Sequence, residues 1–498
     1  MAFTTQLFLF AFFPLSLVVC LLSQWLQDRG ILSGLLERLR LADLALIGVG
    51  CLFYLWTCFD DLLRLLAYIA VVWLLGLVIG RCCSSGTGLL LERKSPEREQ
   101  WPIPLSAVVL TAGVTFLVWV LVHFKYTDML AQVWNFFFKD HRTGSGAAAL
   151  LGISFITFSA ISYLADICKG KAEPGKLIDC ILYLTFFPKV VSGPIVLWRD
   201  FQPQIPRRRM TMEGFSEGAQ RMMMGFAKKL ILADTFGTCV ASASAAVDVP
   251  TAWGIGLLYM LQIYYDFSGY SDAALGLSRM LGFEFKENFD FPYISTSITE
   301  FWRRWHISLG TWFREYIYFP LGGSRAGTAR TLVNIGVVFL LTGVWHGAGW
   351  TYMLWGILNG LCNIAEKLLK DNRLYQRTPK LLKWAATMTV TYFAWELFRF
   401  EDFSACLRWF GVMFGLVRFE SIPYGWQYYF DLRMIVLAVV GILGATVWGL
   451  PRVQAAYKRF TGSRWGYLVH GLVLVVLFGI SILFMVNSKY SPFIYFQY

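Results

Sequence analysis

The chain has 498 residues, of which 57% are hydrophobic and only 15% are charged, and its mean hydropathy is +0.54. A soluble protein of this length would carry more charge, so the composition favours an integral membrane protein. The net charge of +12 is not accompanied by any nucleic-acid-binding motif. We attribute it to basic loops that attract anionic lipid head groups, and we expect a lipid bilayer and no nucleic acid as partner.

Apolar stretches long enough to cross a bilayer, which takes about 17–25 helical residues, recur from end to end. They cover residues 6–26, 43–59, 62–80, 104–124, 148–165, 218–245, 252–268, 331–346, 350–366, 384–399, 433–450 and 467–486. Three further stretches, 178–197, 273–283 and 404–417, are too short or too interrupted by Pro and Gly to cross cleanly. The sequence therefore predicts an all-α fold, a polytopic transmembrane bundle of about 10–12 spans with re-entrant and in-plane helices.

The polar stretches between these spans are too short to build a soluble domain with its own core. We therefore predict a single integral-membrane domain over residues 1–498. Within it we distinguish N-terminal spans in 1–145, a catalytic core in 146–400 and C-terminal spans in 401–498. The first apolar run lacks both a preceding basic residue and a following cleavage site, so we expect it to be retained as a span.

Basic residues gather in alternate loops, and such loops stay in the cytoplasm. Arg29, Arg38 and Arg40 follow the first span, and basic clusters recur at 367–383 and 452–464. This distribution places both termini outside the membrane. The triplet at 207–209 also favours the cytoplasm, which suits a re-entrant path for the preceding segment FFPKVVSGPIVLWRDF.

The ten cysteines are scattered, without a CxxC pair or the Cys/His spacing of a zinc site. The sequence also lacks a Walker-type phosphate loop and a repeat of fixed period. We therefore expect no metal site and no bound cofactor.

Two of the five histidines lie in Trp-His pairs within one short stretch. The first, His306, lies in an apolar stripe of alternating three- and four-residue spacing from Ile298 to Phe319, which predicts one continuous helix. Arg303 and Arg314 share one flank of this helix, and His306 falls at its boundary. A helix so charged would lie along an interface or pack under the bundle. A functional histidine and a packing histidine are equally compatible with this position.

The second, His346, ends an apolar run at membrane depth and is surrounded by Gly343, Gly347 and Gly349. These glycines predict a close helix approach or a broken helix. Ionisable groups at this depth are costly and usually functional, so His346 suits a general base that takes a proton from a hydroxyl attacking an acyl group. The alternative is a histidine that hydrogen-bonds a neighbouring helix.

A third polar cluster interrupts the apolar run LYMLQIYYDFSGYSDAALGLSRMLG at Asp266. This carboxylate needs a partner, which we expect to be a histidine or an arginine of residues 303–314. Gly269 suggests a bend, and a purely architectural hydrogen-bond network is as compatible as a substrate role. Lys228 and Lys229 are either interfacial anchors whose side chains reach toward water or contacts to an anionic ligand, and we favour anchors.

Several strings together closely resemble the membrane-bound O-acyltransferase (MBOAT) family, and more narrowly its bacterial alginate O-acetyltransferase branch. They are YYDFSGYSDAALGL, ENFDFPYISTSITEFWRRWHISLGTWFREYIYFPLGG, LLTGVWHGAGWTYMLWGILNG, FFPKVVSGPIVLWRDF, GFAKKLILADTFG, ELFRFEDFSA and SPFIYFQY. The resemblance covers most of residues 150–498 and is looser over the N-terminal spans.

The resemblance implies acyl transfer to a hydroxyl, with the histidine of the WHG motif, His346, as the catalytic residue and His306 of the RRWH motif also implicated. The residues we expect to bind substrate or support the histidines are Asp266, Tyr265, Trp305, Arg303, Arg304, Trp345 and Asn359. Acetyl-CoA, or another acyl thioester, would be the cytoplasmic donor substrate. The acceptor would be an extracytoplasmic polysaccharide or a partner acetyltransferase that modifies it, as in exopolysaccharide biosynthesis at a bacterial plasma (inner) membrane.

Three rival functions remain. Within the family, the nearest alternative is transfer of D-alanine from a carrier protein towards teichoic acid. Attachment of a lipid chain to a secreted protein matches the sequence less well. A proton-coupled transporter would be expected to have paired half-helices in two homologous halves, a symmetry that this sequence lacks. A structural scaffold ranks last, because it would not need two Trp-His pairs.

Overall fold

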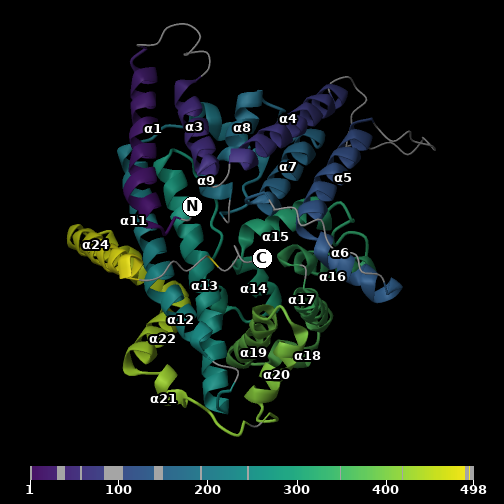
Figure 1. Ribbon diagram of the computed structural model, residues 1–498, viewed down its shortest axis with the longest axis vertical. Coiled ribbons are helices and arrows are strands. Elements are labelled where there is room, and N and C mark those ends of the chain that lie inside the picture. The colour runs from purple at the N-terminus through teal and green to yellow at the C-terminus, as the bar shows by residue number, and fades with distance from the viewer. Residues whose placement is uncertain are drawn as a thin grey trace. The chain divides into compact units, whose positions relative to one another are not determined.

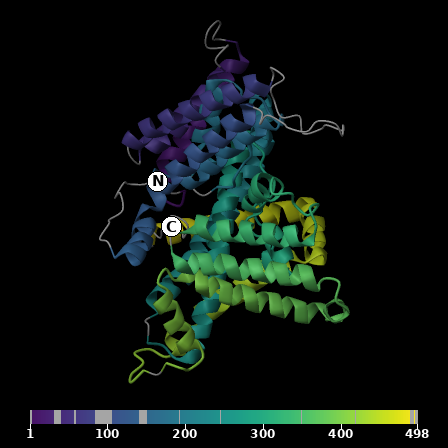
Figure 2. The same ribbon diagram turned by 90° about the vertical axis from the view of Figure 1, so that its right-hand side faces the viewer.

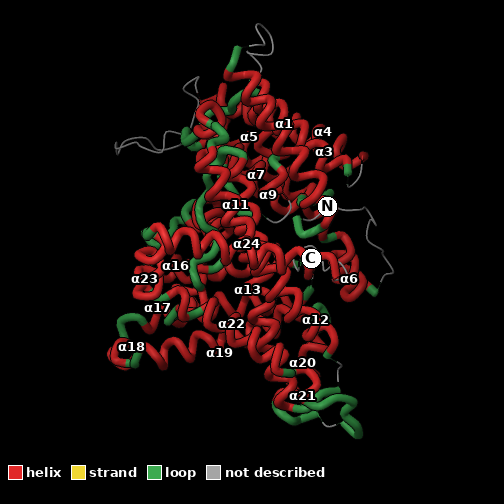
Figure 3. The backbone as a smooth tube through the Cα atoms, turned by 90° about the vertical axis from the view of Figure 1, so that its left-hand side faces the viewer, coloured by secondary structure: helices red, strands yellow, loops and turns green. Residues whose placement is uncertain are grey.

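The computed structural model describes residues 3–30, 40–56, 59–83, 105–139, 150–190, 193–243, 246–347, 349–417, 419–487 and 493. Every regular element in these ranges is a helix, and none of the described residues forms a strand (Figure 3). The predicted all-α fold class is confirmed.

The chain divides into two compact units, and the division falls within α11 (Met212–Phe226) and α13 (Val249–Met280) (Figure 1). The first unit holds most of residues 3–218 together with 274–285, and the second holds 219–273 together with 286–498. Both candidate histidines belong to the second unit.

The first unit is built around an aromatic core. Its helices are η1 (Phe8–Phe12), α1 (Phe13–Asp28), α3 (Leu41–Leu55), α4 (Phe59–Cys82), α5 (Leu105–Lys125), α6 (Thr127–Phe138), α7 (Ile153–Cys168), α8 (Leu177–Thr185), α9 (Phe187–Val190), α10 (Trp198–Phe201) and η3 (Gln202–Arg207). The buried ring of Phe187 lies 5.5 Å from that of Phe12 and 5.8 Å from that of Phe53. Ring contacts of this kind add about 0.5–1.5 kcal/mol each to simple burial.

The segment predicted to be interrupted, 178–197, is indeed broken. Helix α8 ends at Thr185, α9 is only four residues long, and residues 193–197 are not helical. This irregular backbone is buried, and Tyr183 Oη donates to the carbonyl of Val196 at 2.7 Å. Such protein-buried irregularity is what a membrane interior tolerates, whereas its path relative to the bilayer stays a prediction.

The second unit contains the remaining helices. They are η4 (Ala227–Ala233), α12 (Asp234–Ser242), η5 (Pro292–Ile294), α14 (Ile298–Arg304), α15 (Ile307–Phe313), η6 (Arg314–Tyr318), α16 (Thr328–His346), α17 (Trp350–Leu369), α18 (Arg373–Arg377), α19 (Lys380–Arg399), α20 (Phe403–Met413), α21 (Trp426–Tyr429), α22 (Leu432–Ala445), η7 (Val447–Gly449), α23 (Pro451–Thr461) and α24 (Arg464–Asn487). In Figure 2 the green helices α16, α17 and α19 lie side by side.

By length and composition, six helical segments of the described chain are able to cross a membrane. They are Phe8–Asp28, Phe59–Cys82, Leu105–Lys125, Thr328–His346, Leu432–Gly449 and Arg464–Asn487. Shorter apolar helices lie at Leu41–Leu55, Ile153–Cys168 and Phe403–Met413. The protein is a multi-pass membrane protein, as the composition predicts.

Helices α16 and α17 pack backbone to backbone. A Cβ atom added to Gly343 would lie 2.5 Å from the carbonyl oxygen of Tyr352, and one added to Gly356 would lie 2.5 Å from that of Phe339. Glycine is therefore required at both positions, which confirms the close helix approach predicted around Gly343. This packing fixes the end of α16, where His346 lies.

Helix α13 joins two stretches that the sequence analysis treats separately, 252–268 and most of 273–283, because it continues without interruption to Met280. Gly269 lies inside this helix. A Cβ atom there would lie 2.7 Å from the carbonyl oxygen of Gly225, so the glycine serves a close approach between two helices.

Candidate active site

His346 occupies a helix break, as its flanking glycines predict. Helix α16 ends at His346, Gly347 is extended, and α17 begins at Trp350. The His346 side chain is 4% exposed. Its ring centroid lies 5.0 Å from that of Trp355 and 5.2 Å from that of Phe398, both in edge contact. Aromatic rings thus form much of its surroundings.

His306 lies at a sharp bend, so the prediction of one continuous helix from Ile298 to Phe319 is wrong. Helix α14 ends at Arg304 and α15 begins at Ile307, with His306 between them at φ 45° and ψ 55°. This left-handed conformation is uncommon for a residue with a Cβ atom and persists only where surrounding contacts hold it.

Backbone hydrogen bonds to an earlier loop hold this bend. The amide of Ile307 donates to the carbonyl of Asn288 at 2.9 Å, and the amide of Asp290 donates to the carbonyl of Arg304 at 2.9 Å. The loop therefore takes up backbone groups on both sides of His306 that a continuous helix would have used. A stripe of apolar residues cannot reveal that a distant loop competes for these backbone hydrogen bonds.

The His306 side chain is 1% exposed and makes polar contacts. Its Nδ1 lies 3.1 Å from Asn288 Oδ1, and Asn288 Nδ2 donates to Ser271 Oγ at 3.0 Å. On its other side the ring meets Phe267 edge-on at 4.6 Å. Burial lowers the pKa of His306 from its ordinary 6.5 to about 3, so the imidazole is neutral at pH 7. Asn288 was not predicted from the sequence, although it lies within one of the strings that resemble the family.

Trp345 joins the two histidines. Its ring centroid lies 6.4 Å from that of His306 and 5.0 Å from that of His346. The structure therefore brings together three of the predicted site residues in one buried aromatic region.

Asp266 has a different partner from those predicted. Its Oδ1 lies 2.5 Å from Lys229 Nζ, which also contacts Asp234 Oδ1 at 2.7 Å. The Lys229 side chain is 4% exposed, so the prediction that it is an anchor reaching toward water is wrong. Lys228 is likewise paired, with Asp272 Oδ2 at 2.6 Å. Both lysines neutralise carboxylates of α13, because a buried charge requires a counter-charge.

Tyr265 and Trp305 both lie in the second unit, with different neighbours. Tyr265 Oη donates to the carbonyl of Gly441 in α22 at 2.6 Å. The buried Trp305 ring packs 4.7 Å from that of Trp395, which in turn lies 6.0 Å from that of Trp355 beside His346. Trp305 therefore belongs to the aromatic surroundings of the site, whereas Tyr265 ties α13 to α22.

Asn359 and Arg304 have structural partners. Asn359 Oδ1 accepts from the indole N–H of Trp302 at 3.1 Å. Arg304 pairs with Asp290 at 2.8 Å, while Arg303 is exposed. These contacts orient α14, and a substrate role for these residues stays a prediction.

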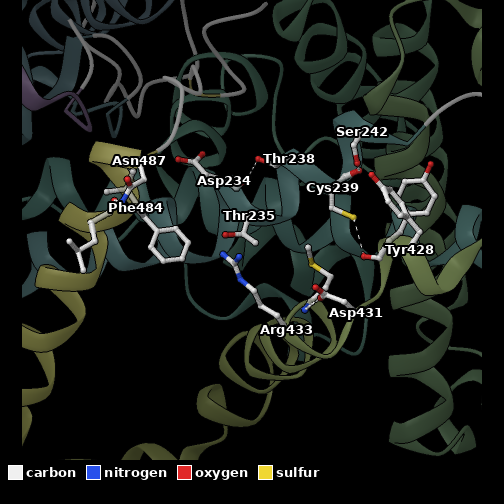
Figure 4. Close-up of a pocket in the computed structure, with 14 residues that line it drawn as sticks. Asp234, Thr235, Thr238, Cys239, Ser242, Tyr428, Asp431, Arg433, Phe484 and Asn487 are labelled. Carbon is white, nitrogen blue, oxygen red and sulfur yellow. Dashed lines mark hydrogen bonds between the residues drawn. The ribbon is translucent and has the colours of Figure 1, made fainter. Parts of the chain in front are cut away.

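A separate pocket of about 690 Å³ lies among α12, α21, α22 and α24 (Figure 4). Asp234, Thr235, Asp431 and Arg433 are among its lining residues, and neither histidine is. Within the described parts of the chain, no three His, Cys, Asp or Glu side chains are grouped to hold a metal ion.

The chain is similar in sequence to several known proteins. The model of the membrane-bound O-acyltransferase family matches residues 105–400. The chain is 34% identical to the probable alginate O-acetylase AlgI of Pseudomonas putida over the whole of both proteins. It is 31% identical to the peptidoglycan O-acetyltransferase of Helicobacter pylori over 62% of this chain and 64% of that protein. It is 30% identical to the teichoic acid D-alanyltransferase of Bacillus subtilis over 55% of this chain and 74% of that protein. Both histidines lie inside the matched region.

Proposed function

This chain belongs to the membrane-bound O-acyltransferase family, and we propose that it moves an acetyl group from a cytoplasmic thioester to a hydroxyl outside the membrane. Two of the relatives described above are named for O-acetylation of a polymer, one of them over the full length of both chains. The acceptor is accordingly an extracytoplasmic polysaccharide, or a partner acetyltransferase that passes the group to one.

The observation that carries this proposal is the burial of two histidines around the shared ring of Trp345. A general base has to lie within reach of the reacting hydroxyl and away from bulk water, which would compete as an acceptor. His346, at the helix break, is the base. It removes the hydroxyl proton as the oxygen attacks the thioester carbon, and the proton then passes to the departing thiolate.

His306 and the residues around it bind or orient substrate in this scheme. The neutral imidazole offers a hydrogen-bonding nitrogen, and Trp305 and Trp345 exclude water from the site. Asp266 acts through its ion pair with Lys229, which holds α13 behind Phe267 and His306. Acetyl-CoA is a donor substrate in this reaction, and no bound cofactor takes part.

The setting follows from the reaction and from the distribution of basic residues. The proposed setting is a bacterial plasma (inner) membrane, which suits a donor made in the cytoplasm and an acceptor outside, and the basic loops favour both termini outside. Reporter fusions at either end, one active only in the cytoplasm and one active only outside it, test this orientation. A cytoplasmic signal from either terminus would contradict it.

D-Alanyl transfer from a carrier protein is the second candidate, because the B. subtilis relative named for it covers more than half of this chain. It uses the same thioester chemistry and differs in the donor. Parallel assays with acetyl-CoA and with D-alanyl carrier protein separate the two.

The test uses purified protein in nanodiscs with radiolabelled acetyl-CoA and alginate oligosaccharides, with and without a co-expressed extracytoplasmic partner. We expect release of free CoA and transfer of label, and loss of both in His346→Ala. His470→Ala is the matched control, because His470 contacts Tyr457 of α23 and neither candidate histidine. Full activity in His346→Ala would overturn the catalytic assignment, and turnover with D-alanyl carrier protein alone would overturn the choice of donor.

A further inference from the structure

Hydrogen bonds define the orientation of the Asn288 side chain. The backbone amide of Ser308 lies 3.2 Å from Asn288 Oδ1. A backbone N–H is only a donor, so the Asn288 atom that faces it must be the carbonyl oxygen. The Ser308 hydroxyl donates to the same oxygen at 2.8 Å. The amide nitrogen then points the other way, 3.0 Å from Ser271 Oγ.

This orientation determines where His306 carries its proton. Asn288 Oδ1 is an acceptor, and it lies 3.1 Å from His306 Nδ1. Ser308 Oγ also lies 3.4 Å from Nδ1, but its hydroxyl donates to Asn288 Oδ1 at the shorter distance of 2.8 Å. The hydrogen bond between Asn288 and His306 exists only if Nδ1 carries the proton, because two acceptors repel each other. In a neutral imidazole the remaining nitrogen, Nε2, is then unprotonated and accepts hydrogen bonds. That atom is buried and has no hydrogen-bond partner among the described residues.

Ion pairs of Arg221 connect the segments that carry Asn288 and Ser271. Arg221 contacts Asp272, next to Ser271, at 3.0 Å. The same guanidinium donates to Glu287, next to Asn288, at 2.6 Å. Burial alone would raise the pKa of Asp272, but Lys228 and Arg221 outweigh it and hold that pKa below its usual range, so the carboxylate stays charged. Arg221 thereby ties α13 to the loop that carries Asn288.

We propose that Asn288 is a positioning residue that holds His306 in the Nδ1-protonated tautomer, so that Nε2 accepts a hydrogen bond from an O–H or N–H group of a substrate. This inference rests on the proposed function. It adds that His306 is an acceptor of hydrogen bonds rather than a cation, and that residue 288 decides this.

Two substrates offer a donor of that kind. A sugar acceptor carries hydroxyls beside the one that reacts, and the pantetheine arm of acetyl-CoA carries amide N–H groups. Loss of the hydrogen bond would raise KM for whichever molecule provides the donor. The two KM values, measured with acetyl-CoA and with alginate oligosaccharides, therefore identify the source.

The first test is spectroscopic and independent of turnover. Protein labelled with ¹⁵N only at its histidines gives ring nitrogen signals that distinguish the two neutral tautomers and the cation, and His306→Gln identifies the His306 signals among the five histidines. We expect the Nδ1-protonated form in the wild type and its loss in Asn288→Leu. Asn288→Asp keeps an acceptor at the same place and should keep the proton on Nδ1.

Asn334→Leu is the matched control for the loss of a buried amide. Asn334 is 1% exposed in α16, and its Nδ2 donates to the carbonyls of Leu321 and Gly323, not to a histidine. It should leave the His306 signals unchanged at comparable thermal stability. If the wild type carries its proton on Nε2, or if Asn288→Leu leaves the signals as they were, the inference is overturned.

The second test is kinetic. Asn288→Leu should raise KM for one substrate about tenfold, the equivalent of one hydrogen bond, and Asn288→Asp should recover part of that loss. An effect on kcat alone, or equal losses in Asn288→Leu and Asn288→Asp, would contradict the inference. A wild-type protein that keeps the Nδ1-protonated tautomer but transfers no acetyl group would refute the proposed function and leave the tautomer assignment standing.

Discussion

The two histidines are buried to a similar degree, yet the protein holds them by different means. His346 ends a membrane-spanning helix and meets rings, those of Trp345, Trp355 and Phe398. His306 lies at a left-handed bend outside the six candidate spans, and the amide of Asn288 binds one of its nitrogens.

Ring contacts exclude water from an imidazole. The Asn288 amide in addition selects which nitrogen of His306 carries the proton before substrate arrives. A base has to change its protonation during the reaction, whereas an orienting group has to keep it. Under the proposed function, His346 has the changing role and His306 the constant one.

The sharpest test of this contrast exchanges each imidazole for an amide. His346→Gln cannot take up a proton, so we expect the rate of acetyl transfer to fall by about 10²–10⁴-fold, the usual contribution of a general base. His306→Gln keeps a hydrogen-bond acceptor and should lose far less. Initial rates with radiolabelled acetyl-CoA decide the matter. Equal losses of rate in the two variants would contradict different roles for His346 and His306.

A second test removes the charge that supports the helix behind His306. Lys229→Met leaves the buried Asp266 without its lysine, which should cost about 3–5 kcal/mol of stability, read as a lower melting temperature. Lys228→Met is the control, because this lysine is 24% exposed and its partner Asp272 also contacts Arg221. Lys229→Met together with Asp266→Asn should recover part of the loss. Equal melting of the two single variants would contradict a buried pair at Lys229.

A third test addresses the helix pair that positions His346. Gly343→Ala pushes a Cβ atom to 2.5 Å from the Tyr352 carbonyl, so we expect a loss of about 1–3 kcal/mol together with reduced turnover. Gly336→Ala, in the same helix, meets its nearest atom, Ile364 Cδ1, only at 4.0 Å and should be neutral or stabilising. Thermal melting in detergent compares them, and equal effects would mean that the α16–α17 contact does not control the site.

The smallest expected effect is a loss of folding stability at low pH. The pKa of His306 is lowered to about 3 in the folded protein, so below pH 6.5 the unfolded chain binds a proton that the folded chain does not. Stability attributable to His306 is therefore complete above pH 6.5 and falls as the pH drops, by about 1 kcal/mol at pH 5.5. His306→Gln should lose less stability than the wild type between pH 7.5 and 5.5. Identical losses would show that His306 is not kept neutral.

Features encoded locally could be predicted from the sequence. Apolar length located the helices closely, as for the stretch 62–80, which lies within Phe59–Cys82. Glycines around His346 predicted its helix break, and the family resemblance is confirmed by the family model and by relatives over the full chain.

Features that depend on partners far away in the sequence could not be predicted. The bend at His306 exists because a loop 18 residues earlier takes up backbone hydrogen bonds, and the sequence shows only the uninterrupted stripe. Asp266 required a cation, but nothing in the sequence indicated Lys229, 37 residues away, over the arginines nearer the histidine. The spacing of apolar residues identifies the buried face of a helix, but it does not identify the segment that packs against that face.

The contact between α16 and α17 also bears on how the protein enters the membrane. Among the six candidate spans, Thr328–His346 has the lowest hydropathy, 1.4, and α17 is 20 residues long yet is not one of the six. Neither helix is strongly driven into lipid alone, whereas the glycines at 343 and 356 join their backbones. The two helices would therefore partition into the bilayer together as a hairpin. Biogenesis would then bring His346 and Trp355 together in one insertion step, and defects at the glycines would first appear as failed integration.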